Sequence, residues 1–196
     1  MAGDDRDHSK NCRLPGDTSS HPDYKSTIGN GPSAIDNPRL ASAWSALALV
    51  TDPEIPVLGV VDMGIIADVR IDGDRVIVDL TPTFTGCPAL DVIRRDIQGA
   101  LAGIGETTAT VNVVYHPPWT SDRITETGRR KLKEFGLAPP QRGCGAHLVD
   151  LETVACPYCD STNTTLESLF GPTLCRSIHY CNACRQSFEH FKPVGQ

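Results

Sequence analysis

Two cysteine pairs near the C-terminal end of the chain have the spacing of a metal site. Cys156 and Cys159 form one Cys-x-x-Cys pair, and Cys181 and Cys184 form the other. Each pair places two thiolates on a tight turn, and two such turns supply four sulfur ligands in a tetrahedron around one ion. The stretch between the pairs slightly exceeds the usual ~15–20 residues, which a hairpin of short strands can absorb. We predict a tetrathiolate site for zinc, with a rubredoxin-like iron as the other candidate.

The segment that carries these pairs, residues 151–196, supplies the few strand-forming residues that a small β module needs. Such a short segment cannot easily build a sufficient core alone, so the bound metal should keep it folded. Two redox-active Cys-x-x-Cys pairs would need a βαβ context, which the sequence pattern lacks. We therefore predict a zinc-ribbon-like β module.

A fifth cysteine, Cys87, lies between an alternating strand pattern and an amphipathic helix pattern. Gly86 allows an unusual backbone angle, Cys87 is expected at the helix N-cap, and Pro88 suits the first helical position. A thiol there would feel the unpaired amides and the positive pole of the helix, which lower its pKa and favour the reactive thiolate. The other interpretation is a small apolar filler between helix and sheet. Position alone does not decide between the two.

Carboxylates and hydroxyls upstream of Cys87 are its candidate companions. Asp52 and Glu54 lie on a proline-rich loop, where a carboxylate could ligate a metal or orient a proton. Asp52 could equally cap or break a helix before the proline that follows it. Hydroxyls stand on alternate positions of the segment before Cys87: Thr81, Thr83 and Thr85. These threonines could also serve only as β-branched strand formers.

These residues need a scaffold, which the hydrophobic pattern predicts within residues 37–136. Helical spacing of apolar residues covers 38–50, 88–104 and 122–135, whereas alternation predicts strands over 65–71, 76–80 and 109–115. A strong hairpin signal, Asp72-Gly73-Asp74, joins the first two strands. The predicted fold class is α+β, a small two-layer domain with a three-stranded sheet and helices, followed by the β module.

Two further segments have the composition of unpacked chain. Residues 1–36 are rich in Asp, Ser, Gly, Pro and Asn, and we expect a disordered N-terminal tail. Residues 137–150, which contain Cys144, are expected to be a linker to the module at 151–196. Cys175, between the two pairs, is either a buried filler or a spare thiol.

Charge and hydropathy argue against a nucleic-acid-binding, membrane-spanning or secreted protein. The chain has 196 residues, a formal net charge of −6 and no long basic run, so nucleic acid is a poor default partner. No run approaches the length of a membrane span, and the N-terminus lacks the apolar core of a secretory signal. We expect a cytoplasmic protein without a membrane partner. Its eight cysteines then indicate metal or thiol chemistry rather than structural disulfides.

Three blocks of the first domain resemble the iron–sulfur assembly domain family that includes SufT. The blocks are Asp52-Pro-Glu-Ile-Pro-Val57, Val61-Asp-Met-Gly-Ile65 and Thr81-Pro-Thr-Phe-Thr-Gly-Cys87-Pro88. The continuation is similar to the PaaD family, the D proteins of phenylacetyl-CoA epoxidase systems. Three segments followed by the four-cysteine tail carry this likeness: Pro118-Trp-Thr-Ser-Asp-Arg-Ile-Thr125, Gly128-Arg-Arg-Lys-Leu132 and Phe135-Gly-Leu-Ala-Pro-Pro140. The likeness covers about residues 38–193 and leaves the N-terminal tail uncovered.

The resemblance implies a non-catalytic assembly factor rather than the oxygenase itself. Cys87 would be the functional thiol that transiently holds iron or an iron–sulfur cluster, with Asp52 as a companion and Glu54, Thr83 and Gly86 around it. The oxygenase subunit or the reductase subunit of the epoxidase would be the client. A single thiolate cannot saturate iron, so further ligands would come from a homodimer partner, the client or glutathione.

Two other functions stay open. A thiol enzyme would use Cys87 as a nucleophile on an acyl or thioester substrate and would need a base, for which His116 and His147 are the histidines able to approach. A zinc-ribbon adaptor would instead use the tail to bind another macromolecule. Four acidic side chains against three basic ones from Leu151 onward argue against nucleic acid as that partner.

Overall fold

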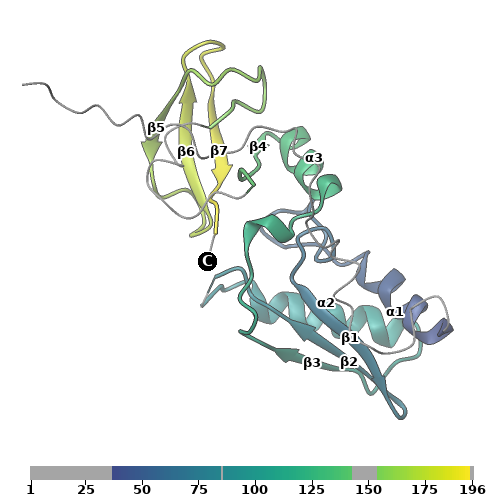
Figure 1. Cartoon of the computed structure of the whole chain (residues 1–196). Coiled ribbons are helices and arrows are strands. Elements are labelled where there is room, and N and C mark those ends of the chain that lie inside the picture. Colours follow the sequence, from purple (N-terminus) through teal and green to yellow (C-terminus); the bar gives the residue numbers. More distant parts are fainter. Residues whose placement is uncertain (1–36, 85, 143–153, 195–196) are drawn as a thin grey trace, which may run out of the picture.

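A computed structural model describes residues 37–84, 86–142 and 154–194 of the chain. They form two neighbouring modules, with a short helix between them (Figure 1). The first module, which we call the assembly domain, contains α1 (Pro38–Leu47), β1 (Ile66–Asp72), β2 (Arg75–Leu80), α2 (Leu90–Gly103) and β3 (Thr110–Val113). The second module, which we call the ribbon, contains β4 (Leu137–Ala138), β5 (Thr164–Ser168), β6 (Arg176–Cys181) and β7 (Ser187–Phe191).

The sheet of the assembly domain has the order β1-β2-β3. β1 and β2 form an antiparallel hairpin that closes at the pair Asp72 and Arg75, where Gly73 takes a positive φ of 58°. β3 runs parallel to β2, so the chain must cross over between them, and α2 makes that crossover. Both α1 and α2 cover the same face of the sheet (Figure 1).

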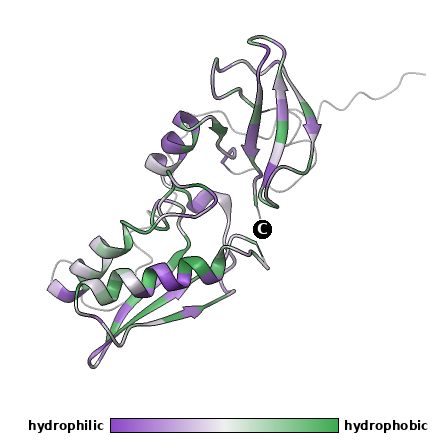
Figure 2. Cartoon of the chain, turned by 180° about the vertical axis from the view of Figure 1, so that it is seen from behind, coloured by the Kyte–Doolittle hydropathy of each residue, from purple (hydrophilic) through white to green (hydrophobic). Residues whose placement is uncertain are grey.

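The two faces of this sheet differ as the sequence alternation requires. Buried Val76, Val78 and Leu80 of β2 face the helices, where α2 contributes the buried stripe Ile93, Ile97 and Leu101. This helical spacing puts the three apolar side chains of α2 on one side, and the polar residues between them give the mixed colouring along the helix in Figure 2. The opposite face is polar, and Asn112 of β3 donates a 2.9 Å hydrogen bond to Asp79 of β2 there.

A short helical segment leads from the assembly domain to the ribbon. It contains the 3-10 helix η2 (Ser121–Arg123) and the helix α3 (Glu126–Glu134). Thr125 caps α3 by accepting a 3.0 Å hydrogen bond from the amide of Gly128. Asp62 in turn accepts from the Thr125 hydroxyl at 2.8 Å and pairs with Lys131 at 2.7 Å. These contacts fix the helix against the assembly domain.

The ribbon sheet has the order β4-β7-β6-β5. β5, β6 and β7 are antiparallel neighbours, whereas the two-residue β4 runs parallel to β7. The first two residues of the predicted linker therefore form a strand of the ribbon sheet. The rest of that linker, from residue 143 and including Cys144, lies outside the described residues, as does the predicted tail 1–36.

The ribbon packs directly against the assembly domain. Phe191 of β7 and Leu137 of β4 are buried in the same hydrophobic cluster as the assembly-domain core. The rings of Phe191 and Trp119 lie 6.1 Å apart, and the amide of Ser121 donates a 2.9 Å hydrogen bond to the carbonyl of Val194. One apolar cluster therefore runs through both modules.

The predicted α+β class with a C-terminal β module is confirmed, although the three helices and β3 are shorter than expected. α1 ends at Leu47 instead of residue 50, and β3 ends at Val113 instead of residue 115. α2 begins at Leu90, two residues later than predicted, because Pro88 and Ala89 form a turn ahead of it. Among the described residues, no helix combines the length and apolar character that crossing a bilayer requires.

Candidate functional site

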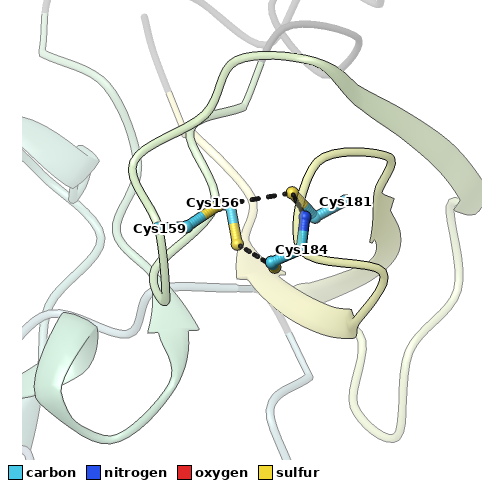
Figure 3. A group of neighbouring side chains, drawn as sticks. All are labelled: Cys156, Cys159, Cys181 and Cys184. Carbon is cyan, nitrogen blue, oxygen red and sulfur yellow. Dashed lines mark hydrogen bonds between the residues drawn. The ribbon is translucent and has the colours of Figure 1, made fainter.

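The four cysteines of the two pairs converge at one end of the ribbon. Cys156 and Cys159 lie on the loop before β5, Cys181 ends β6, and Cys184 lies on the turn that leads into β7 (Figure 3). All four sulfur atoms lie within 4.8 Å of one another. The predicted tetrathiolate group is therefore assembled, and its composition is that of a metal-binding site.

Its dimensions agree with a tetrahedral thiolate site. The Sγ atoms of Cys156 and Cys184 are 3.7 Å apart, and those of Cys159 and Cys181 are 3.6 Å apart. A metal–sulfur distance of ~2.3 Å gives a tetrahedral edge of about 3.8 Å, close to both separations. The donor set and these two separations thus fit one tetrahedrally coordinated metal ion.

The two turns that present these sulfurs share one local geometry. The residues that directly follow the second cysteine of each pair, Asp160 and Arg185, both have a positive φ, of 60° and 61°. Each of their amides donates to the carbonyl of the first cysteine in its pair, at 2.9 Å for Cys156 and 2.8 Å for Cys181. The amide of Cys184 also donates to the sulfur of Cys181, which lowers the pKa of that thiol to about 6. Such amide bonds favour the thiolate form that a metal requires.

Cys87 occupies a different position from the one that its sequence context predicts. It lies on the loop after β2 and is half-buried, and its carbonyl accepts from the amide of Leu90 at 3.2 Å. The residue at the N-cap of α2 is Ala89, without a side-chain cap. The prediction that Cys87 caps this helix is therefore wrong, because the turn at Pro88 and Ala89 delays the first helical residue.

The prediction of an acidified thiol at Cys87 is also wrong. Burial raises the pKa of Cys87 above its ordinary value, and the amide of Ala89 opposes this only in part. The carboxylates of Glu54 and Asp52 raise this pKa further, because a second negative charge nearby disfavours the thiolate. The thiol of Cys87 therefore holds its proton until a positive charge compensates it.

Asp52 is a turn-forming residue in this structure. It is buried, and its Oδ1 accepts from the amides of Glu54 at 2.7 Å and Ile55 at 3.0 Å. These bonds hold the proline-rich loop in the shape that carries Glu54. Asp52 therefore has a structural role in a turn and neither caps nor ends a helix, since α1 already ends at Leu47, while its charge still acts on Cys87.

A pocket of about 240 Å³ opens beside Cys87. From the assembly domain, Glu54, Thr83 and Phe84 line it together with Cys87 and Pro88. Gly86, next to Cys87, is exposed and has a positive φ of 81°, so it shapes the loop. The structure therefore brings Glu54, Thr83 and Cys87 to one pocket, whereas Asp52 is buried and is not among the described residues that line it.

The other wall of the pocket belongs to the ribbon, which sequence reasoning missed. The residues of this wall all come from the loop between β5 and β6: Phe170, Gly171, Pro172, Thr173, Leu174 and Cys175. Phe170 and Leu174 are exposed large apolar side chains on this loop. Only the presence of a leftover thiol, Cys175, in the sequence signalled that this loop could take part.

The histidines proposed as bases lie elsewhere. His116 is exposed and is not among the residues that line the pocket. His147 lies outside the described residues. His179 and His190 are buried inside the ribbon, where burial lowers their pKa values to about 4 and about 3. Both are therefore neutral at physiological pH and serve as packing residues.

Comparison with known proteins assigns each module. Residues 40–113 match the family model described as "Iron-sulfur cluster assembly protein", and residues 143–192 match the one described as "PaaD zinc beta ribbon domain". Over 89 residues the chain is 38% identical to the "Fe-S protein maturation auxiliary factor YitW" of Bacillus subtilis (strain 168), a match that covers 44% of this chain and 86% of that protein. The "Fe-S protein maturation auxiliary factor SufT" of Staphylococcus aureus (strain USA300) is 38% identical over 86 residues, covering 43% of this chain and 97% of that protein.

One relative spans both modules. The D subunit of a putative 1,2-phenylacetyl-CoA epoxidase of Escherichia coli (strain K12) is 38% identical over 161 residues, which cover 82% of this chain and 96% of that protein. Its match is longer than either module, whereas the relatives named as Fe–S maturation factors match less than half of the chain. The chain belongs to the PaaD family, that of the D subunits of phenylacetyl-CoA epoxidase systems.

Proposed function

We propose that this chain is a non-catalytic maturation factor of a phenylacetyl-CoA epoxidase. It passes iron or an iron–sulfur cluster through Cys87 to the oxygenase or the reductase subunit of that system. The relatives named as Fe–S maturation factors match only the assembly domain, whereas the D subunit of the epoxidase matches both modules. We infer that the assembly domain supplies the transfer chemistry and that the ribbon adapts it to one client.

The observation that carries the proposal is the Cys87 pocket. The wall that carries Cys87 lies within the segment that matches the iron–sulfur assembly family, and it presents a thiol and the carboxylate Glu54 to a space of about 240 Å³. Sulfur and oxygen donors of this kind suit iron. Because the Cys87 thiol is protonated until a cation arrives, the cargo would be held loosely and released by reprotonation.

We propose zinc as the resident ion of the tetrathiolate group, held by Cys156, Cys159, Cys181 and Cys184. Four closed thiolate ligands are typical of structural zinc, which has no redox chemistry of its own. Zinc bound there would keep the ribbon folded next to the pocket. The chain would then contain one tight structural ion and one labile cargo site.

The thiol-enzyme alternative has less support. A cysteine nucleophile needs a base within hydrogen-bond reach, usually histidine. Among the described residues that line the pocket there is no histidine, and the nearest carboxylates raise the pKa of Cys87. A ground-state thiol in these surroundings is a poor nucleophile and a suitable ligand for an incoming metal.

Co-expression of the epoxidase subunits tests the proposal. We expect the purified client subunit to contain its full iron content with the wild-type chain and clearly less with Cys87→Ser or without the chain. The matched control is Cys12→Ser, another single thiol removed from the same chain. Equal iron in every subunit under all four conditions would refute a maturation role.

A further inference from the structure

Cys87 and Cys175 face the same pocket although they come from different modules. Cys87 lies on the loop after β2 of the assembly domain, and Cys175 directly precedes β6 of the ribbon. Both thiols are half-buried. Cys175 is not one of the four clustered cysteines of the ribbon, so its sulfur is available for another role.

The position of Cys175 is fixed by several contacts. Its carbonyl accepts a 2.8 Å hydrogen bond from the amide of Lys192, and its sulfur lies 3.0 Å from the hydroxyl of Thr173. The next residue, Arg176, is buried and donates to the carbonyl of Glu54 across the module boundary, while its guanidinium also pairs with Glu189 at 2.6 Å. The same loop of the assembly domain therefore carries Glu54 into the pocket and anchors the ribbon beside it.

The carboxylates near the two thiols favour a cation between them. Burial is the main cause that raises the pKa of Cys175, as it is for Cys87. Glu54 and Asp52 raise the pKa of both thiols, whereas the Thr173 hydroxyl and the positive charge of Arg176 lower that of Cys175. Cys175 itself is among the groups whose negative charge raises the pKa of Cys87. A divalent ion would offset two of the three negative charges that two thiolates and the Glu54 carboxylate bring together.

The donor atoms of this pocket are less closely gathered than those of the tetrathiolate group. Among the described residues, the four ribbon cysteines are the group whose ligand atoms all lie within 4.8 Å of one another, and Cys87, Cys175 and Glu54 do not form such a group. The pocket of about 240 Å³ has room for several water molecules of roughly 30 Å³ each, and so for a metal ion that keeps part of its hydration. An open site with few protein ligands is what a transferable ion requires.

Resting on the proposed function, we propose that Cys175 is the second thiolate ligand of the transfer site, so that Cys87 and Cys175 together hold a divalent iron-class ion between the two modules. On binding, two metal–sulfur bonds form, each thiol releases one proton to solvent, and bound waters leave the ion without any change in oxidation state. The ribbon thus supplies a ligand that the assembly domain lacks, in place of a ligand from a homodimer partner or a small thiol.

Anaerobic titration of the zinc-loaded full chain with Co²⁺ tests this assignment. Thiolate ligands give Co²⁺ a charge-transfer absorption whose intensity follows the number of bound sulfurs. We expect the wild type to bind one further, chelator-labile Co²⁺, and Cys175→Ser to bind it roughly tenfold or more weakly with about half the charge-transfer intensity. Cys12→Ser, as the control, should behave as the wild type, and zinc content should stay unchanged in all three proteins.

Cys87→Ser separates this inference from the function that it deepens. If Cys87→Ser loses the labile Co²⁺ while Cys175→Ser keeps wild-type affinity and absorption, the role of Cys175 is refuted and that of Cys87 stands. If neither substitution changes Co²⁺ binding, both proposals fail.

A crosslinking measurement on the wild type needs no substitution and covers the case in which Cys175→Ser does not fold. Dibromobimane joins two nearby thiols when each thiolate displaces one bromide, with the thiol protons passing to solvent. We expect mass spectrometry to find the peptides of Cys87 and Cys175 joined, and Co²⁺ added beforehand to prevent it. Separate modification of the two cysteines, with no joined peptide, would overturn the proposal.

Discussion

The ionisation of Cys87 is controlled by its surroundings more than by the nearby helix. Burial and the carboxylates of Glu54 and Asp52 raise its pKa, so at neutral pH the thiol is protonated. In the role that we propose, metal binding at Cys87 would displace this proton, so the affinity for a cation should increase as the pH rises. Without a cation the protonated thiol would be unreactive toward other electrophiles.

Alkylation of Cys87 should report this control. Glu54→Gln removes a negative charge that disfavours the thiolate, so the pKa of Cys87 should fall and its alkylation by iodoacetamide near pH 8 should become several-fold faster. Peptide mass spectrometry over a pH series measures the rate at this residue alone. Glu167→Gln, an exposed carboxylate of β5, is the control and should leave the rate unchanged. A slower reaction in Glu54→Gln would contradict the electrostatic explanation.

The two cysteine sites were predictable to different degrees. The tetrathiolate group was predictable from the sequence because each Cys-x-x-Cys pair forms a local turn, and both turns have the same geometry. The pKa of Cys87 was not predictable, since it depends on Glu54 and Asp52, which reach it through the tertiary fold. The helix boundary at Leu90, which removes Cys87 from the N-cap, depends on a two-residue turn that periodicity cannot place.

At the scale of elements, the packing of α3 against the assembly domain depends on Gly128, because there is no room for a side chain at this position. A Cβ at Gly128 would lie 2.9 Å from the carbonyl oxygen of Asp62 and 3.1 Å from a methyl of Leu58. A backbone oxygen at that distance cannot move without shifting the loop that carries it. The close approach of α3 to the assembly domain therefore requires glycine at this position.

Two helical glycines offer a matched test of this requirement. Alanine normally stabilises a helix by about 0.5–1 kcal/mol relative to glycine, and Gly99→Ala on the exposed side of α2 should gain that amount because nothing lies within 4 Å of its Cβ. Gly128→Ala should instead lose about 1–3 kcal/mol through overpacking. Urea unfolding of both variants measures the difference, and a gain in stability for Gly128→Ala would show that α3 is free to move.

The sequence pattern predicted most elements of the assembly domain, because their burial follows a period of two or 3.6 residues. It could not predict β4, since Leu137 and Ala138 are too few to show any period and pair with a strand about 50 residues later. What makes this segment a strand is the open edge of β7, a tertiary feature.

At the scale of the whole molecule, the metal group and the assembly domain are coupled through a shared core. Phe191 and Leu137 belong to the ribbon sheet, yet both are buried in the cluster that contains the assembly-domain residues. Loss of ribbon structure would expose this part of the cluster. The stability of the assembly domain should therefore depend on the tetrathiolate group.

Removal of the metal tests that coupling. Withdrawing one large aromatic side chain from a core costs about 3–5 kcal/mol, so a strong chelator under reducing conditions should lower the Tm of the whole chain by roughly 10 °C. Calorimetry should show one transition with and without chelator. Cys181→Ser, which lacks a ligand, should already melt low and respond little to the chelator. Two transitions, with the upper one insensitive to chelator, would contradict the shared core.

The meeting of Cys175 with Cys87 is the feature of the site furthest from the reach of sequence. The two residues belong to modules with separate motifs, and nothing in either motif specifies how the modules dock. Their proximity depends on contacts such as that of Arg176 with the Glu54 carbonyl, which form only when both modules are folded. The candidate role of Cys175 therefore follows only from the way in which the two modules pack together.

The parallel strand β4 also limits where the gene of such a protein can be recombined without disrupting the ribbon sheet. The edge strand β4 of the ribbon sheet directly follows α3 in the sequence and precedes residues 143–153. Its partner β7 is near the end of the chain. A gene fusion that exchanged the four-cysteine segment alone would separate these partners and leave β7 with an unpaired edge. A recombination event that keeps β4 with β7 must therefore have its boundary before Leu137. The four-cysteine segment alone is not an independent structural unit.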